Sequence, residues 1–236
     1  MKLITLILIS VYSISTFAGE DNVYDFSWLD SDKEIYVLQN RKFKKKSRIY
    51  LGGQLGRSIN GAFIDSSRVS LSGGFFFQED WGFELSYTKA DGQTNTTHDS
   101  VKEQSNAVAF YRKIDTEMTA MLLWSPFYSK INTFNKIFYY DWMFGAGFST
   151  VTTLDNRNEF DDASPDSNKL TQESNTGISW MTAFRFYITD NWSSELRFRA
   201  THVNADYASE NQSNQDTTEK RWIHYYNFNV GLNYTF

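Results

Sequence analysis

Residues 222–236, with the sequence WIHYYNFNVGLNYTF, decide the fold of this chain. Counting back from the last residue in steps of two gives a mostly apolar and aromatic set: Phe236, Tyr234, Leu232, Val230, Phe228, Tyr226, His224 and Trp222. The residues between them are mostly small or polar. Because a β-strand sends successive side chains to opposite faces, the stretch predicts a strand with one apolar and one polar face. Aromatic residues near both ends of the apolar set are typical of a lipid-facing band with two girdles.

The composition restricts how such a chain could cross a membrane. It has 236 residues, of which 17% are aromatic, two are proline and none is cysteine. Few prolines suit a chain of hydrogen-bonded strands, and the absence of cysteine excludes disulfides and thiolate metal sites. The net charge of −5 argues against nucleic acid as a partner. No apolar run reaches the ~20 residues of a membrane helix, so a membrane protein of this composition must be a closed barrel.

The first 48 residues do not show the strand pattern. Residues 1–18 are predicted to be a signal peptide, with Lys2 before an apolar core and Thr16-Phe17-Ala18 as the cleavage site. Residues 19–48 form a predicted N-terminal periplasmic extension that ends in the basic run 41–48, RKFKKKSR. We expect this run either to contact anionic headgroups or a periplasmic partner, or to form a solvated collar.

The barrel is predicted to occupy residues 49–236. Alternation indicates eight strands, at 49–57, 68–78, 81–89, 118–124, 137–152, 177–188, 192–207 and 222–236. Short connections at 79–80 and 189–191 alternate with long ones, as periplasmic turns alternate with outer loops; the expected turn at 125–136 is longer than that rule favours. The predicted fold is therefore all-β, a single closed antiparallel transmembrane β-barrel of eight strands. An apolar stretch at 107–112 leaves ten strands as an alternative count.

The same alternation turns six charged side chains inward: Glu84, Asp141, Arg185, Glu195, Arg197 and Arg199. An eight-stranded barrel is just wide enough for its side chains to fill it, and buried charges need partners. The set therefore predicts a lumen ion-pair network that plugs the barrel, with a gated ion path or a catalytic cluster as alternatives. Inward glycines are expected to make room for the arginines. Four tryptophans are predicted to lie in the lipid-facing girdle: Trp81, Trp142, Trp180 and Trp222.

Two polar groups at the predicted outer side were considered as sites. Acidic residues between strands could bind a divalent ion that bridges to lipopolysaccharide phosphates: Asp155, Glu159, Asp161, Asp162 and Asp166. They lack the spacing of a calcium loop, so a solvated loop is favoured and no metal site is firmly predicted. His202 with Ser209 and nearby acids could form a lipid-modifying enzyme, but no spacing supports it. The sequence predicts no cofactor and no enzyme activity.

Three stretches resemble one family: residues 34–46 (EIYVLQNRKFKKK), 124–130 (WSPFYSK) and 138–148 (FYYDWMFGAGF). They are similar to outer membrane β-barrel domain proteins of myxobacteria and Bdellovibrio-like predators, and the architecture is similar to small OmpA-, OmpX- and OmpW-type barrels. The resemblance implies a barrel in the outer membrane of a Gram-negative bacterium, with no assigned enzyme activity. The ending Leu232, Tyr234 and Phe236 looks like the signal that the barrel-assembly machinery recognises.

The expected partners are outer-membrane lipid and lipopolysaccharide, with the assembly machinery during biogenesis and no nucleic acid, and the chain is expected to be a monomer. The expected role is surface interaction, adhesion or membrane integrity. A narrow pore or small-molecule transporter is the alternative.

Overall fold

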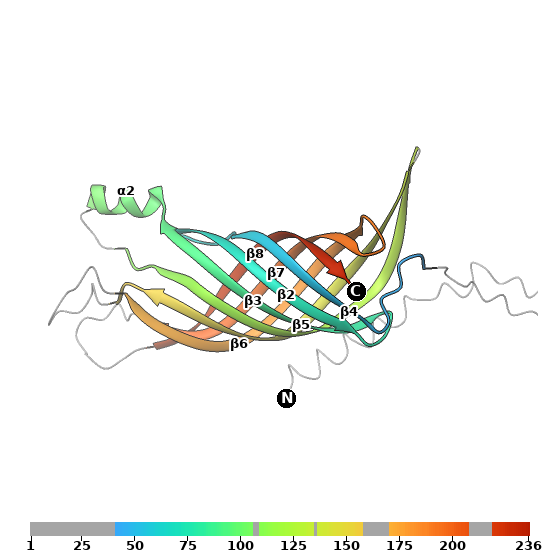
Figure 1. Ribbon diagram of the computed structural model, residues 1–236. Coiled ribbons are helices and arrows are strands. Elements are labelled where there is room, and N and C mark those ends of the chain that lie inside the picture. Colours follow the sequence, from blue (N-terminus) through green and yellow to red (C-terminus); the bar gives the residue numbers. More distant parts are fainter. Residues whose placement is uncertain (1–40, 106–108, 135, 158–169, 208–218) are drawn as a thin grey trace, which may run out of the picture. The chain divides into compact units, whose positions relative to one another are not determined.

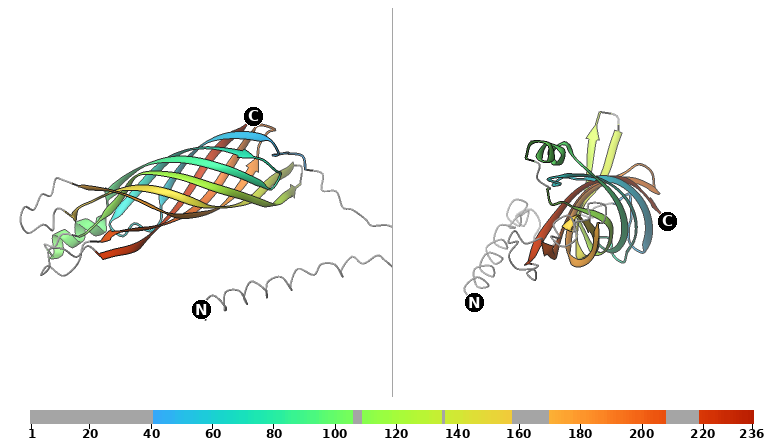
Figure 2. Two further views of the ribbon diagram at one scale, coloured as in Figure 1. Left: turned by 90° about the horizontal axis from the view of Figure 1, so that it is seen from below. Right: turned by 90° about the vertical axis from the view of Figure 1, so that its left-hand side faces the viewer.

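The computed structural model describes residues 41–105, 109–134, 136–157, 170–207 and 219–236; the predicted signal peptide lies outside them. Eight antiparallel strands form a closed barrel in chain order (Figure 1). They are β1 (Arg48–Ser58), β2 (Ile64–Phe76), β3 (Trp81–Thr94), β4 (Arg112–Thr133), β5 (Lys136–Asp155), β6 (Thr171–Tyr187), β7 (Trp192–Tyr207) and β8 (Glu219–Thr235). Pairing of β1 with β8 closes the ring (Figure 2). The predicted fold class and the count of eight strands are confirmed.

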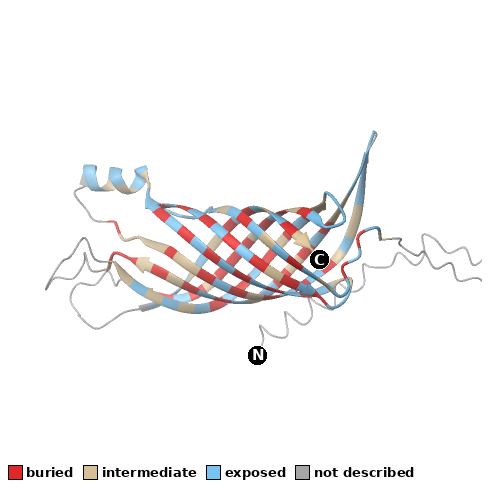
Figure 3. Cartoon of the chain, in the orientation of Figure 1, coloured by how far each residue is buried: buried red, intermediate tan, exposed pale blue. Residues whose placement is uncertain are grey.

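Burial alternates residue by residue along the strands and forms the checkered pattern of Figure 3. On β8, Val230 is 48% exposed on the outside while its neighbour Asn229 is 4% exposed in the lumen. This pattern differs from that of a water-soluble protein, because most large apolar side chains point outward. The centre holds polar and charged side chains together with a buried apolar cluster that includes Met121, Leu123, Met143 and Met181. The pattern places the band of exposed aromatic and aliphatic side chains where lipid would contact the barrel.

One outward position is covered. Ala200 has the parity of the lipid-facing set, yet it is fully buried. Its direct neighbours on the adjacent strands are Trp180 and Tyr226. Two large aromatic side chains on either side of its methyl group leave Ala200 no accessible surface, although it lies on the outward side of β7.

The two ends of the barrel differ. The end with the chain terminus has the turns at 77–80 and 188–191 and is called the turn end; the opposite end is called the loop end. At the loop end β2, β3, β4 and β6 are longer than predicted, because their ladders continue where apolar and polar residues no longer alternate in the sequence. A helix that was not predicted, α2 (Thr96–Ser105), also lies there (Figure 1).

Helix α2 has a local cause. The side chain of Asn95 accepts hydrogen bonds from the backbone N–H groups of Thr97 and His98, each at 3.1 Å, and so caps the helix. The helix is polar all round, and therefore lacks the apolar stripe by which a helix is recognised in a sequence. Among the described residues, no helix has the length and apolar content needed to cross a membrane.

The expected turn at 125–136 is wrong. Instead, β4 runs to Thr133 and β5 starts at Lys136, so the two strands form a long hairpin. The register shifts between Trp124 and Phe127, where Pro126 lies. A bulge tolerates a residue without an N–H group, so β4 continues through Pro126.

Candidate functional site

The lumen is the candidate site. Within the described ranges, ten charged side chains are buried, five of each sign: Lys45, Arg68, Arg185, Arg197 and Arg199 against Glu84, Glu117, Asp141, Asp155 and Glu195. All six charges that alternation turned inward are among them. Because an isolated buried charge is strongly unfavourable, the equal numbers indicate that the lumen is built from pairs.

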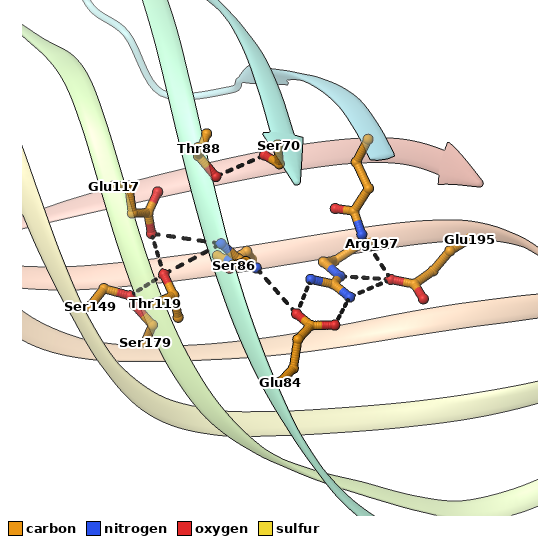
Figure 4. A network of polar contacts seen from close by, with 12 residues as sticks. Ser70, Glu84, Ser86, Thr88, Glu117, Thr119, Ser149, Ser179, Glu195 and Arg197 are labelled. Carbon is orange, nitrogen blue, oxygen red and sulfur yellow. Dashed lines mark hydrogen bonds and ion pairs between the residues drawn. The ribbon is translucent and has the colours of Figure 1, made fainter. Parts of the chain in front are cut away.

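The central network joins four strands. Arg197 on β7 donates to both carboxylate oxygens of Glu84 on β3, at 2.5 and 2.7 Å, and to Oε1 of Glu195 at 2.7 Å (Figure 4). Arg185 on β6 donates to Glu195 Oε2 through Nε at 3.0 Å and Nη2 at 2.9 Å. The hydroxyl of Tyr50 on β1 donates to Glu84 at 2.5 Å, and the Arg185 guanidinium lies 4.2 Å from the centre of the Tyr50 ring. Two acids thus share two arginines across the barrel.

A second network lies nearer the loop end. Arg68 on β2 pairs with Glu117 on β4 and donates to Asn227 on β8 at 2.5 Å. Glu117 also accepts a hydrogen bond from Thr201 at 2.8 Å. Arg199 lies between the two networks, 4.0 Å from Glu117 and 3.8 Å from Glu84. Beside it a row of hydroxyls crosses four strands, at 2.7, 2.6 and 2.9 Å: Thr119, Ser149, Ser179 and Thr201. Figure 4 shows the first three.

The basic run closes the turn end. Lys45 is buried, and its ammonium donates to Asp141 at 2.7 Å and to the Ser125 hydroxyl at 2.6 Å. Tyr187 donates to the same Asp141 oxygen at 2.5 Å, and its ring stacks on Phe43 with centroids 4.5 Å apart. Lys45 and Phe43 are therefore buried, which neither expectation foresaw, whereas Lys42, Lys44 and Lys46 are exposed, as in a solvated collar. The buried carboxylate of Asp141 requires a counter-charge, and the Lys45 ammonium supplies it.

A third group of pairs lies at the loop end. Arg112 donates to Asp155 at 3.0 Å and to Glu173 at 3.2 Å, and Arg157 pairs with the same two acids at 2.7 and 2.6 Å. The carboxylate of Asp155, which accepts hydrogen bonds from Arg157, raises the pKa of that guanidinium. A cavity of about 280 Å³ opens beside Arg112, lined also by Ile64, Ile114, Ile223 and Tyr225.

Asp155 is the described member of the proposed divalent-ion loop, and its oxygens are held by arginines. Glu159, Asp161, Asp162 and Asp166 lie outside the described residues. In the part of the chain that the structure covers, no group of three or more His, Cys, Asp or Glu is arranged to hold a metal ion.

The predicted girdle and the histidines lie on the outer surface. Trp81, Trp142, Trp180 and Trp222 are all exposed there, Trp81 and Trp142 toward the turn end and the other two toward the loop end. The Trp180 indole donates to Nε2 of His202 at 3.0 Å, and Nδ1 of His202 lies 2.6 Å from Nδ1 of His224. His202 is thus engaged on the lipid side, and Ser209, its proposed nucleophile, lies outside the described residues.

The inward glycines make room for other side chains than expected. A Cβ on Gly52 or Gly56 would overlap Asn233 or Asn229, and a Cβ on Gly74 would overlap the ring of Tyr50. The expectation that these glycines accommodate arginines is wrong. The space beside these glycines is occupied by their neighbours across the strand ladder, Asn233, Asn229 and Tyr50.

Four of the buried charges were not expected in the lumen from the sequence: Lys45, Arg68, Glu117 and Asp155. Arg68 stands directly before the outward Val69, so alternation would have found it. Glu117 and Asp155 lie where the strands were expected to have ended, and Lys45 precedes the first strand. For Lys45 no signal separates it from the other lysines of the run, because its role depends on Asp141, 96 residues away.

One protein family and several solved structures are similar to this chain. The sequence profile of the outer membrane protein beta-barrel domain matches residues 38–236. Solved structures similar to this chain include the N-terminal barrel domain of Pseudomonas aeruginosa OprF (10% identity, TM-score 0.46, covering 81% of this chain and 98% of that one). Neisserial surface protein A gives 11% identity and a TM-score of 0.47 over 80% and 96% of the two chains. The P. aeruginosa protein OprG gives 13% and 0.46 over 82% and 98%.

No curated protein sequence matches the chain, and the likeness to a myxobacterial or Bdellovibrio-like subgroup stays a prediction. With the profile covering the whole described barrel, the chain belongs to the outer membrane protein β-barrel domain family and resides in the outer membrane of a Gram-negative bacterium.

Proposed function

We propose that this protein is a non-conducting, non-enzymatic outer-membrane barrel that holds its loop-end elements at the cell surface. One observation carries the proposal: ion pairs follow one another through the lumen, from Lys45–Asp141 at the turn end to Arg112–Asp155 at the loop end. Short turns of bacterial barrels face the periplasm, so the loop end, with α2, faces outward. A closed barrel in this orientation anchors the protein in the membrane. Contacts with partners are then made by the loop end and the turn end.

The pairs oppose conduction for an electrostatic reason. An ion that passes the central network would have to separate Arg197 from Glu84 or Arg185 from Glu195, and each buried partner would then lose its counter-charge. Removing one partner of a buried pair costs about 3–5 kcal/mol. Pores instead line a wet path with polar groups that an ion can exchange quickly.

Planar-bilayer recording tests the closed lumen. The wild-type protein should show no steady openings, whereas the double variant Glu84→Ala/Arg197→Ala, which removes a matched pair, should show small ones. Leu196→Ala, on the lipid face of the same strand, is the control and should stay closed. Steady wild-type conductance would establish the narrow pore or transporter instead.

The surface role needs a separate test in cells. Replacing residues 95–111 by a short turn removes α2 and leaves the ladder of β3 and β4 at Trp81–Lys89 untouched. We expect cells that carry this variant to keep their barrier to a hydrophobic dye and to lose attachment to surfaces. If cells with the shortened variant admit the dye, the function is membrane integrity. If they attach to surfaces as well as wild-type cells do, the surface role is contradicted.

A lipid-modifying activity is the remaining alternative. The imidazole of His202 accepts a hydrogen bond from Trp180 and contacts His224, and so is held by groups that would not activate a nucleophile. We expect no turnover of labelled phospholipid in detergent. Turnover that His202→Ala abolishes would identify the protein as an enzyme.

We also propose that Leu232, Tyr234 and Phe236 form the assembly signal. The backbone N–H of Phe236 donates to the carbonyl of Ile49 at 2.9 Å, which makes the last residue part of the closing β1–β8 seam. Phe236→Ala should lower the amount of folded barrel in the membrane while purified protein still refolds in detergent. Equal loss in both settings would indicate a folding defect rather than a recognition defect.

A further inference from the structure

The β4–β5 hairpin extends beyond the barrel at the turn end. Strand β3 leaves β4 at the pair Trp81–Trp124, and β6 leaves β5 at the pair Tyr187–Tyr139. From there to the tip, the two hairpin strands pair only with each other, ending at Thr133 and Lys136. At 3.3 Å a residue, the tip stands roughly 15 Å past the last β6 pair. Figure 1 shows this projection beside the C-terminus.

The projecting part is apolar where a water-exposed turn would be polar. Phe134 at the tip is fully exposed, and Ile131, Ile137 and Phe138 are each about half exposed. Exposed apolar groups gathered in one place mark a surface that meets a partner or a membrane. The other connections at this end are short, as is usual for periplasmic turns, so the extension is not needed to join two strands.

The apolar face of the hairpin continues the lipid-facing surface of the barrel. Phe127 contacts Trp142 with ring centroids 5.6 Å apart, and Trp142 stacks on Phe184 at 5.4 Å. Ile131 and Phe138 are paired and share the outward parity of Phe127. The bulge at Pro126 bends β4, and the hairpin points away from the ring of strands (Figure 2). It therefore extends to the side of the barrel, over the surrounding lipid.

The charges suit an anionic surface. Lys130 and Lys136 flank the tip, and no acidic residue occurs between residues 125 and 140. The base of the hairpin holds a further cation, since the ammonium of Lys42 lies 5.6 Å from the centre of the Tyr139 ring. The Tyr128 hydroxyl accepts hydrogen bonds from the backbone N–H groups of Lys42 and Phe43, at 3.2 and 3.3 Å. The basic run is therefore seated against the hairpin.

We propose that the hairpin tip, residues 131–134 and 136–138, lies in the headgroup layer of the periplasmic leaflet and binds anionic phospholipid. Aromatic and aliphatic side chains would enter the boundary with the acyl chains, while Lys130 and Lys136 would contact phosphates; this combination is the usual one for interfacial segments. The proposal does not depend on whether the lumen conducts. It assigns a lipid contact to a segment that a barrel does not need in order to close.

Site-directed spin labelling of the full chain in nanodiscs tests the position of the tip. The chain contains no cysteine, so Asn132→Cys gives a single label on the hairpin, and Asp190→Cys gives a matched label in a short turn of the same end. With phosphatidylglycerol present, the Asn132 label should be shielded from a water-soluble nickel chelate and the Asp190 label should not. Equal access for both labels would overturn the proposal.

Two variants separate the charged from the apolar contribution. Lys130→Gln/Lys136→Gln should lower the ratio of docked to free hairpin about 25-fold in phosphatidylglycerol bilayers, about fivefold for each lysine, and have little effect in phosphatidylcholine. Phe134→Ser/Ile137→Ser/Phe138→Ser should abolish docking in both, while Thr133→Ser should leave it intact. Heat-modifiability on gels checks that each barrel is folded.

If the Asn132 label is immobilised but remains fully accessible to the nickel chelate, something other than lipid holds the hairpin. This result would contradict the proposal in either lipid. Dependence of that immobilisation on protein concentration would identify a second copy of the chain on the open edge of β4. Independence from concentration would indicate a contact within the chain.

Discussion

The two faces of β7 obey different physical rules. Glu195 and Arg197 point into the lumen, are almost fully buried, and are held by partners on β1, β3, β6 and β8. Leu196 and Phe198 point outward, are partly exposed, and meet only neighbouring side chains and lipid. Stability in the lumen therefore depends on which residue faces which, whereas stability on the lipid face depends on polarity and size alone. Each prediction below tests one side of this comparison.

The largest effect is expected from Glu195→Ala. The change leaves Arg185 and Arg197 in the lumen with one acceptor fewer each, and removal of one member of a buried pair costs about 3–5 kcal/mol. Urea unfolding of the refolded barrel, followed by tryptophan fluorescence, measures the loss. Leu196→Ala, one position along on the lipid face, should cost less; a reversed order would contradict the comparison.

Val230→Arg is expected to be next in size. It places a charge on the lipid face near the middle of the membrane, where an arginine costs about 2–4 kcal/mol in a barrel. Val230→Leu keeps the surface apolar and is the control. The same unfolding experiment in lipid vesicles gives both values, and equal stability of the two variants would show that this face does not meet hydrocarbon.

Two glycines on neighbouring strands give a matched test of packing. A Cβ on Gly74 would overlap the Tyr50 ring and disturb its bond to Glu84, so Gly74→Ala should cost about 1–3 kcal/mol by overpacking. A Cβ on Gly53, on the outside, meets nothing within 4 Å. Gly53→Ala should therefore change stability by less than about 0.5 kcal/mol. A similar cost at both positions would mean that the lumen is less tightly filled than its contacts indicate.

The smallest effect is expected at a charge pair outside the lumen. Lys89 and Asp115 lie 2.5 Å apart at the loop end, where water screens them. Lys89→Gln should leave the unfolding midpoint unchanged. A measurable loss would show that ion pairs in this protein stabilise it wherever they occur, and the contrast between lumen and surface would fail.

Much of the fold could be predicted from the sequence, because the alternation of side chains is a local property. It marked β7 with its observed bounds and turned Glu84, Arg185 and Arg197 toward the centre, where the structure places them. It failed where the alternation fades: β4 was expected to end before Pro126, and α2 was not expected at all. In both places the backbone obtains its hydrogen bonds from a neighbouring strand or a capping Asn95, and neither depends on an apolar pattern.

The sequence by itself determined which residues face lipid and which face inward, since a strand with period two leaves no other choice once one face is apolar. Only the tertiary structure decided the partners: that Lys45 reaches Asp141, that Arg68 meets Glu117, and that the β4–β5 hairpin outruns its neighbours. The two ion pairs join residues 96 and 49 positions apart. They depend on strand register and on the closure of the ring, which bring distant residues to the same level of the lumen.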